Sequence, residues 1–87
     1  MAHVTMYASQ LCGFCHRARR LLDQKGAEVT EIDVGADPAR KREMMAQAGG
    51  AHTVPQIWIG ERHIGGCDEL YALEAEGELD SLLAEAA

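Results

Sequence analysis

Apolar residues recur along the chain at two spacings, which separate expected strands from expected helices. Short runs that alternate or are wholly apolar predict strands at residues 4–7, 28–34, 56–59 and 62–64. Apolar residues three and four positions apart predict helices at residues 14–25, 37–48, 67–74 and 79–83. The predicted order is therefore strand, helix, strand, helix, strand, strand, helix, helix.

Glycine and proline mark the limits of these elements. Asp37 followed by Pro38 is a strong helix start, because Asp accepts from free N–H groups and proline fits the first helical turn. Gly26 and residues 49–50, both glycine, follow the first two helices as stop signals. Residues 60–61 predict a tight turn, so the strands on either side of it form an antiparallel hairpin.

This order of elements predicts an α/β fold. The first strand, the helix after it and the second strand form a parallel pair with a right-handed connection, and the hairpin adds two antiparallel strands. A four-stranded mixed sheet flanked by helices on both sides accounts for every element, in one domain that covers residues 1–87. Thr30, Ile32 and Val34 share one face of the second strand, which predicts an edge strand with one face in solvent.

Composition and charge exclude several classes of partner. The chain has 87 residues, of which 47% are hydrophobic, so it is long enough for one small folded domain. Its net charge of −6 argues against nucleic acid, because phosphate binding needs a basic surface. No apolar run is long enough to cross a membrane, and the first residues do not resemble a secretory signal. We therefore expect a cytoplasmic protein with neither a nucleic acid nor a membrane as its partner.

The strongest chemical signal is Cys12-Gly13-Phe14-Cys15, between the first strand and the first helix. A Cys-x-x-Cys pair that opens a helix indicates reversible dithiol–disulfide exchange. Free N–H groups and the positive end of the helix dipole favour a thiolate on the first cysteine. The three cysteines are too few for a disulfide framework and suit a reducing compartment. With His16 the motif also matches c-type haem attachment, which we disfavour because that modification normally requires export.

Three segments resemble the signature stretches of glutaredoxins, namely Cys12-Gly13-Phe14-Cys15, Thr53-Val54-Pro55 and Gly65-Gly66-Cys67-Asp68. They occur in the family's order and at suitable separations, and the resemblance is closest to the small bacterial dithiol branch. It implies the thioredoxin fold and a glutathione-dependent reduction of protein disulfides and glutathione mixed disulfides. A thioredoxin-like reductase fed by a flavoprotein is a further interpretation, which the third segment disfavours.

The resemblance also implies roles for single residues. Cys12 is expected to be the nucleophile, Cys15 the resolving thiol, and Pro55 a cis-proline that faces the active thiol. Val54 would pair with extended glutathione like an added strand, and Asp68 at a helix start would hold its γ-glutamyl end. The residues expected to contact glutathione are Cys12, Phe14, Thr53, Val54, Pro55, Gly66, Cys67 and Asp68.

Four of these residues also have a purely structural interpretation. Pro55 could simply start an edge strand, and Asp68 could simply cap the helix after it. Phe14 could begin the apolar face of its helix. Cys67 could be a small buried side chain or, as the odd third thiol, a site that glutathione modifies.

Two positions depart from the family's usual pattern. Gly13 stands where the dithiol branch usually has proline, which adds backbone freedom at the site. In the family such loosened sites sometimes hold a [2Fe–2S] cluster between two subunits with glutathione as a ligand, so Cys12 of a homodimer is an alternative metal ligand. Without a cluster we expect a monomer. Ser9 stands where members often have lysine, and Arg17 or Arg40 would have to replace that contact to glutathione.

Overall fold

The structure is a computed structural model that describes residues 2–85. Its elements are β1 Val4–Ala8, α1 Gly13–Gln24, β2 Val29–Asp33, α2 Pro38–Gln47, β3 Gln56–Ile59, β4 Arg62–Gly65, α3 Cys67–Ala75 and α4 Leu79–Ala84. This is the order that the sequence predicts, and every boundary lies within one residue of the predicted one. None of the described helices is long and apolar enough to cross a membrane.

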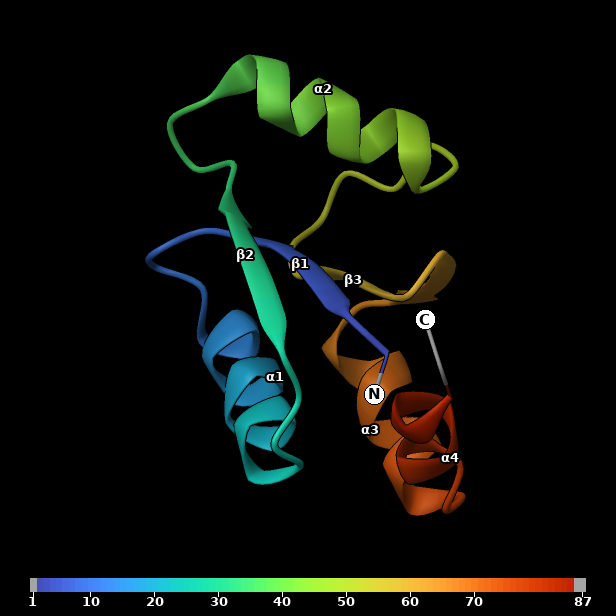
Figure 1. Ribbon diagram of the computed structural model, residues 1–87. Coiled ribbons are helices and arrows are strands. Elements are labelled where there is room, and N and C mark those ends of the chain that lie inside the picture. The colour runs from blue at the N-terminus through green and yellow to red at the C-terminus, as the bar shows by residue number, and fades with distance from the viewer. Residues whose placement is uncertain (1, 86–87) are drawn as a thin grey trace.

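The four strands form one mixed sheet in the order β2-β1-β3-β4 (Figure 1). β1 and β2 are parallel, with Val4 opposite Val29 and Ala8 opposite Asp33. β3 runs antiparallel to both β1 and β4. The predicted four-stranded mixed sheet is confirmed, and so is the edge position of β2.

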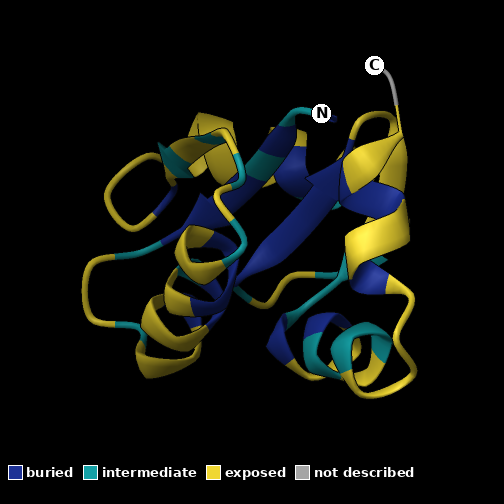
Figure 2. Cartoon of the chain, turned by 60° about the horizontal axis from the view of Figure 1, so that its bottom comes forward, coloured by how far each residue is buried: buried dark blue, intermediate teal, exposed yellow. Residues whose placement is uncertain are grey.

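The sheet carries its larger hydrophobic cluster on the face covered by α1, α3 and α4 (Figure 1). Alternate side chains of a strand point to opposite faces, so Val4 and Met6 of β1 both enter this cluster. Leu22, Leu70 and Leu79 bring one helix each to it, and all five side chains are fully buried. Figure 2 shows this buried layer between exposed outer helix faces.

A smaller cluster lies on the opposite face, beneath α2. It contains Tyr7 of β1, Trp58 of β3, Val34, Met44 and Ala48. The rings of Tyr7 and Trp58 meet edge to face, with centroids 5.4 Å apart. α2 therefore attaches to the sheet through few buried side chains, of which Met44 is the only one within the helix itself.

The Cys-x-x-Cys segment lies at the carboxyl end of β1, where the chain turns into α1. β3 is antiparallel to β1, with Tyr7 opposite Gln56. The segment before β3 therefore reaches the end of the sheet at which β1 finishes. The hairpin then returns the chain through β4 to the start of α3. Three segments that are far apart in the sequence thus approach one another at this end of the sheet, namely residues 11–15, 53–55 and 65–68.

Candidate active site

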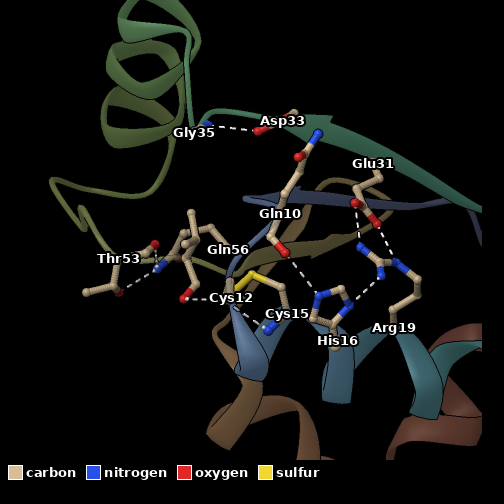
Figure 3. Close-up of a disulfide and its surroundings, with 11 residues drawn as sticks. Gln10, Cys12, Cys15, His16, Arg19, Glu31, Asp33, Gly35, Thr53 and Gln56 are labelled. Atoms are coloured by element: carbon tan, nitrogen blue, oxygen red, sulfur yellow. Dashed lines mark hydrogen bonds and ion pairs between the residues drawn. A yellow bond between two sulfur atoms is a disulfide. The ribbon is translucent and has the colours of Figure 1, made fainter.

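Cys12 and Cys15 form a disulfide, with their Cα atoms 5.2 Å apart (Figure 3). Cys12 is the N-cap of α1 and is half-buried, whereas Cys15 is fully buried one turn into the helix. The first sulfur is therefore the accessible one. The backbone N–H of Cys15 donates to Sγ of Cys12 at 3.1 Å.

This N-cap position favours negative charge on the sulfur of Cys12. The sulfur accepts from a free N–H group of the helix start, as an N-cap oxygen would. The positive end of the dipole of α1 acts in the same direction. After reduction of the disulfide, both effects stabilise the thiolate of Cys12, which is the nucleophilic form of cysteine.

The peptide bond between Val54 and Pro55 is cis. The carbonyl oxygen of Val54 lies 3.7 Å from Sγ of Cys12, so this segment faces the cysteine, as the resemblance implies. The alternative in which Pro55 starts an edge strand is wrong, because β3 begins at Gln56 and lies inside the sheet.

A cavity of about 380 Å³ opens beside Cys12, within the usual range for small-molecule sites. Its lining consists of Phe14, Thr53, Val54, Pro55, Gly66, Cys67, Asp68 and Glu69. The seven other residues expected to contact glutathione with Cys12 all lie in this lining. Phe14 is 56% exposed, so it lines the cavity and does not start the apolar face of α1.

The start of α3 forms one wall of the cavity. Gly66 is the N-cap of α3, so the alternative in which Asp68 only caps this helix is wrong. The N–H of Gly66 donates to Oε1 of Glu69 at 2.6 Å. The N–H groups of Cys67, Asp68 and Glu69 belong to the first turn, where α-helices leave donors without intrahelical partners. This wall therefore combines N–H donors with two carboxylates.

Gly65 is needed for this geometry. Its φ is +112°, in a region that side chains disfavour. A Cβ atom there would lie 2.8 Å from Oε1 and 3.2 Å from Cβ of Glu69. Glycine at this position therefore lets Glu69 fold back over the helix start.

Cys67 lines the cavity but is only 5% exposed. Burial raises the pKa of its thiol, and nearby Arg17 opposes that change in part. The thiol is thus less ionised than that of an exposed cysteine, which agrees with the interpretation of Cys67 as a small buried side chain.

A hydrogen-bonded chain of side chains flanks the disulfide on the side of β2 (Figure 3). Nε2 of His16 lies 3.1 Å from the carbonyl oxygen of Gln10, and Nδ1 of His16 lies 3.0 Å from Nη1 of Arg19. Arg19 also donates through Nε to Oε1 of Glu31 on β2, at 2.6 Å. Arg19 and Glu31 are distant in the sequence, and no sequence pattern predicts this connection between α1 and β2.

Ser9, which stands in place of the lysine, and the two arginines considered as substitutes all lie outside the lining of the cavity beside Cys12. Ser9 lines a separate pocket with Gln10, Leu11, Asp33, Gly35 and Ala36. Arg17 lies over the ring of Tyr71 at 5.2 Å, and Nη1 of Arg40 lies 3.2 Å from Oε2 of Glu43. Neither arginine is part of the lining of the cavity beside Cys12.

Sequence reasoning missed two further residues near the site. Glu69 lies in the cavity wall, and its spacing of three from Gly66 is that of the glutamate in a capping box, although Gly66 has no side chain to complete the box. Gln56 is buried behind Thr53 at the start of β3. A glutamine in an otherwise apolar strand is the sequence signal that could have indicated this buried polar side chain.

Comparisons with known proteins identify the family of this chain. Residues 4–64 match the protein-family model for glutaredoxin. Glutaredoxin 3 of Escherichia coli strain K12 is 48% identical over 83 residues, which are 95% of this chain and 99% of that protein. The solution structure of glutaredoxin from Brucella melitensis is 53% identical with a TM-score of 0.83, covering 95% of this chain and 89% of that chain. The crystal structure of a buckwheat glutaredoxin–glutathione complex is 30% identical with a TM-score of 0.85, covering 94% and 76%. The chain therefore belongs to the glutaredoxins, which are glutathione-dependent disulfide oxidoreductases with a thioredoxin fold.

Proposed function

We propose that this glutaredoxin reduces protein disulfides and removes glutathione from glutathionylated proteins, with glutathione as the electron donor. The observation that carries the proposal is the position of Cys12. Its sulfur is the more accessible one of the pair, it accepts an N–H bond from Cys15, and it lies 3.7 Å from the carbonyl oxygen of Val54, which lines a cavity large enough for a tripeptide. An accessible, stabilised thiolate beside a small-molecule site is the arrangement that thiol–disulfide exchange needs.

Removal of glutathione from a protein needs Cys12 alone. Its thiolate attacks the glutathione sulfur of the mixed disulfide, the protein–glutathione S–S bond breaks, and the protein sulfur leaves as a thiolate that takes up a proton. Cys12 then carries glutathione. A second glutathione thiolate attacks the glutathione sulfur, which forms oxidised glutathione and frees the Cys12 thiolate.

Reduction of a disulfide within a protein needs both cysteines. Cys12 attacks one sulfur of the target and forms a mixed disulfide with it. Cys15 then attacks Sγ of Cys12, which releases the reduced protein and leaves the Cys12–Cys15 disulfide, the state of this structure. Two glutathione molecules return the pair to dithiols, and together they become one oxidised glutathione.

The cavity supports a specific orientation for glutathione. Val54, beside the cis bond, would pair with the extended tripeptide backbone through main-chain hydrogen bonds, and Thr53 and Pro55 would frame it. The first turn of α3, with Gly66 and Cys67, would receive the carboxylate of the γ-glutamyl end. Asp68 would pair with the ammonium group of the γ-glutamyl end, and Phe14 would cover the cysteine of glutathione. The buckwheat complex supports a glutathione site on this fold.

The test is turnover of a glutathionylated peptide by three forms of the protein, namely native, Cys12→Ser and Cys15→Ser. The native protein and Cys15→Ser should turn over with glutathione, whereas Cys12→Ser should be inactive. A native protein without glutathione-dependent turnover would contradict the proposal. An active Cys12→Ser would overturn the role of Cys12.

A second candidate is a [2Fe–2S] carrier in the form of a homodimer. It is favoured by Gly13 at the start of α1, where a Cβ atom would meet nothing within 4 Å, so the space beside this residue is open to a bulky group. Residues 2–85 contain no group of three or more metal-binding side chains, so one subunit would supply Cys12 and other ligands would come from its partner and from glutathione. Anaerobic purification tests it. Brown dimeric protein with visible absorbance supports a carrier, and iron-free monomer contradicts it.

We extend the proposal to the setting in which the protein acts. It would work in the cytoplasm as a monomer unless it binds a cluster, with glutathione and oxidised proteins as its partners. The acidic net charge of −6 supports the expectation that neither nucleic acid nor a membrane is a partner. Gel filtration of the reduced protein tests the oligomeric state.

A further inference from the structure

Gln56 is a buried polar side chain that takes no part in the proposed reaction. It is 4% exposed and is the one polar or charged residue among residues 2–85 that is fully buried. Its Nε2 lies 3.0 Å from the carbonyl oxygen of Thr53 and 3.3 Å from the hydroxyl oxygen of Thr53 (Figure 3). Its Oε1 lies 2.7 Å from Nε2 of His63 on β4. Every polar atom of the amide is thus bonded, which a buried amide requires.

The partners fix the direction of these bonds. The carbonyl oxygen of Thr53 can only accept, so the NH₂ group of Gln56 must face it. The amide oxygen of Gln56 therefore faces His63, whose Nε2 carries the donated proton. The ring of His63 is itself held against Trp58, with centroids 4.7 Å apart and planes 31° from parallel. The chain of donors runs from His63 through Gln56 to Thr53.

These bonds set the orientation of the peptide group between Thr53 and Val54. In a planar trans peptide the C=O and the N–H point in opposite directions. Gln56 holds the carbonyl of Thr53 toward the interior, so the N–H of Val54 points the other way, on the side where Thr53 and Val54 line the cavity. This N–H has no acceptor within the part of the chain that the structure describes.

We propose that Gln56, oriented by His63, is a positioning residue that aims the N–H of Val54 at the backbone of bound glutathione. The inference rests on the proposed glutathione site. It assigns a role in the reaction to two side chains that do not touch the cavity. Without the bonds from Gln56, the Thr53–Val54 peptide is free to rotate, and the donor is aimed correctly only part of the time.

The first test is Gln56→Leu, which keeps the size of the side chain and removes its donors. The KM for glutathione should rise about five- to tenfold, and the Kd of unreactive S-methylglutathione should rise by the same factor, as the loss of one orienting hydrogen bond predicts. The kcat should stay within about twofold, because Cys12 is untouched. The alkylation rate of Cys12 by iodoacetamide should be unchanged for the same reason.

The control is Gln47→Leu, at an exposed glutamine of α2. The amide of Gln47 accepts from the hydroxyl of Tyr7 at 3.5 Å, so it supports the same face of the sheet without contact to Thr53. Its KM and Kd should equal those of the native protein. A loss in this control as large as in Gln56→Leu would show that general loosening of that face is responsible, and would overturn the proposal.

The second test is His63→Phe, which keeps a ring on Trp58 and removes the donor to Gln56. His63 is exposed, so this variant should fold. Its KM for glutathione should rise about two- to threefold, less than in Gln56→Leu, because the bonds to Thr53 remain possible.

The outcomes separate the two proposals. If the native protein has no glutathione-dependent turnover, the proposed function fails. If it turns over and Gln56→Leu has native KM and Kd, only the role of Gln56 fails. If Gln56→Leu does not fold, a native KM in His63→Phe overturns the role. An equal loss of kcat and of alkylation rate would show a collapsed site and would also overturn it.

Discussion

At the scale of single residues, Gly13 is the main departure from the dithiol pattern of the family. It is the first residue of α1, its φ is not positive, and its Cβ position is open. Cys12 before it has φ −107° and ψ 107°, an extended conformation that a following proline accepts. The backbone conformation therefore does not require glycine at position 13. The effect of this glycine is to increase the conformational freedom of the chain.

We accordingly predict that Gly13→Pro stabilises the protein. Proline fits the first position of a helix and restricts the unfolded chain, which contributes about 0.4–1 kcal/mol. For a domain of this size, that corresponds to a Tm higher by about 2–8 °C. Thermal unfolding followed by circular dichroism on the reduced protein measures it. Gly13→Ala, which fills the open space but leaves the N–H in place, shows how much of the gain comes from replacing glycine alone, and a Tm for Gly13→Pro no higher than that of the native protein would contradict the prediction.

Cys67 should make stability depend on alkaline pH. Burial raises the pKa of its thiol above the ordinary value of 9.0, so in the unfolded chain this thiol ionises at lower pH than in the folded protein. Folded protein then binds more protons than unfolded protein, and the free energy of unfolding falls as the pH rises above about 9. Urea unfolding across that range measures the slope. Cys67→Ala should show a smaller slope, and an identical slope would refute the assignment.

At the scale of elements, the start of α3 depends on the turn that precedes it. Gly65 has φ +112° and leaves room for Glu69, whose carboxylate accepts the N–H of Gly66. This arrangement sets the direction of the first turn of α3 and therefore of the wall beside Cys12. Lys25, directly after α1, forms an ion pair with α3, in which its Nζ lies 2.8 Å from Oε1 of Glu74.

Gly65→Ala should therefore destabilise the protein and weaken the proposed glutathione site. The backbone strain and the displacement of Glu69 together cost about 2–3 kcal/mol. Gly60→Ala is the comparison, because Gly60 has φ +60° but its Cβ would meet nothing within 4 Å. It should lose only about 1–2 kcal/mol, the cost of the left-handed backbone alone. Equal losses in urea unfolding would mean that contact with Glu69 does not matter.

At the scale of the whole molecule, the two faces of the sheet are unequally covered. α1 contributes four buried residues, Cys15, Ala18, Leu21 and Leu22, whereas α2 contributes only Met44. Since burial of apolar surface is the main source of stability, α2 is the weakest attachment in the fold. The segments of the candidate active site lie on loops at one end of the sheet, at the last residue of β4 and at the starts of α1 and α3.

Native-state hydrogen exchange should reveal this difference. Amides in the middle of α2 should exchange through local opening at a lower free energy than those in α1. Exchange measured by NMR at increasing low concentrations of denaturant separates the two kinds of opening, because only global unfolding depends strongly on denaturant. Equal free energies and equal denaturant dependence in both helices would refute the prediction.

Much of the fold and of the site is predictable from the sequence because the signals are local. Periodicity, the Asp37–Pro38 start and the glycine stops involve residues close in the chain, and they place all eight elements within one residue. The Cys-x-x-Cys pair at a helix start identifies the reactive centre. The resemblance to glutaredoxins adds the cis bond before Pro55, for which the chain carries no local signal.

The tertiary structure decides what depends on contacts between distant segments. The approach of Cys12 to Val54 joins residues 42 positions apart, and the bond between His63 and Gln56 depends on the pairing of β4 with β3. Single-residue patterns do not specify which side chains meet across a sheet, since such meetings depend on register and on burial. Local patterns along the chain specify the elements, their order and the reactive pair, whereas packing between distant segments sets which polar groups surround that pair and in which direction they point.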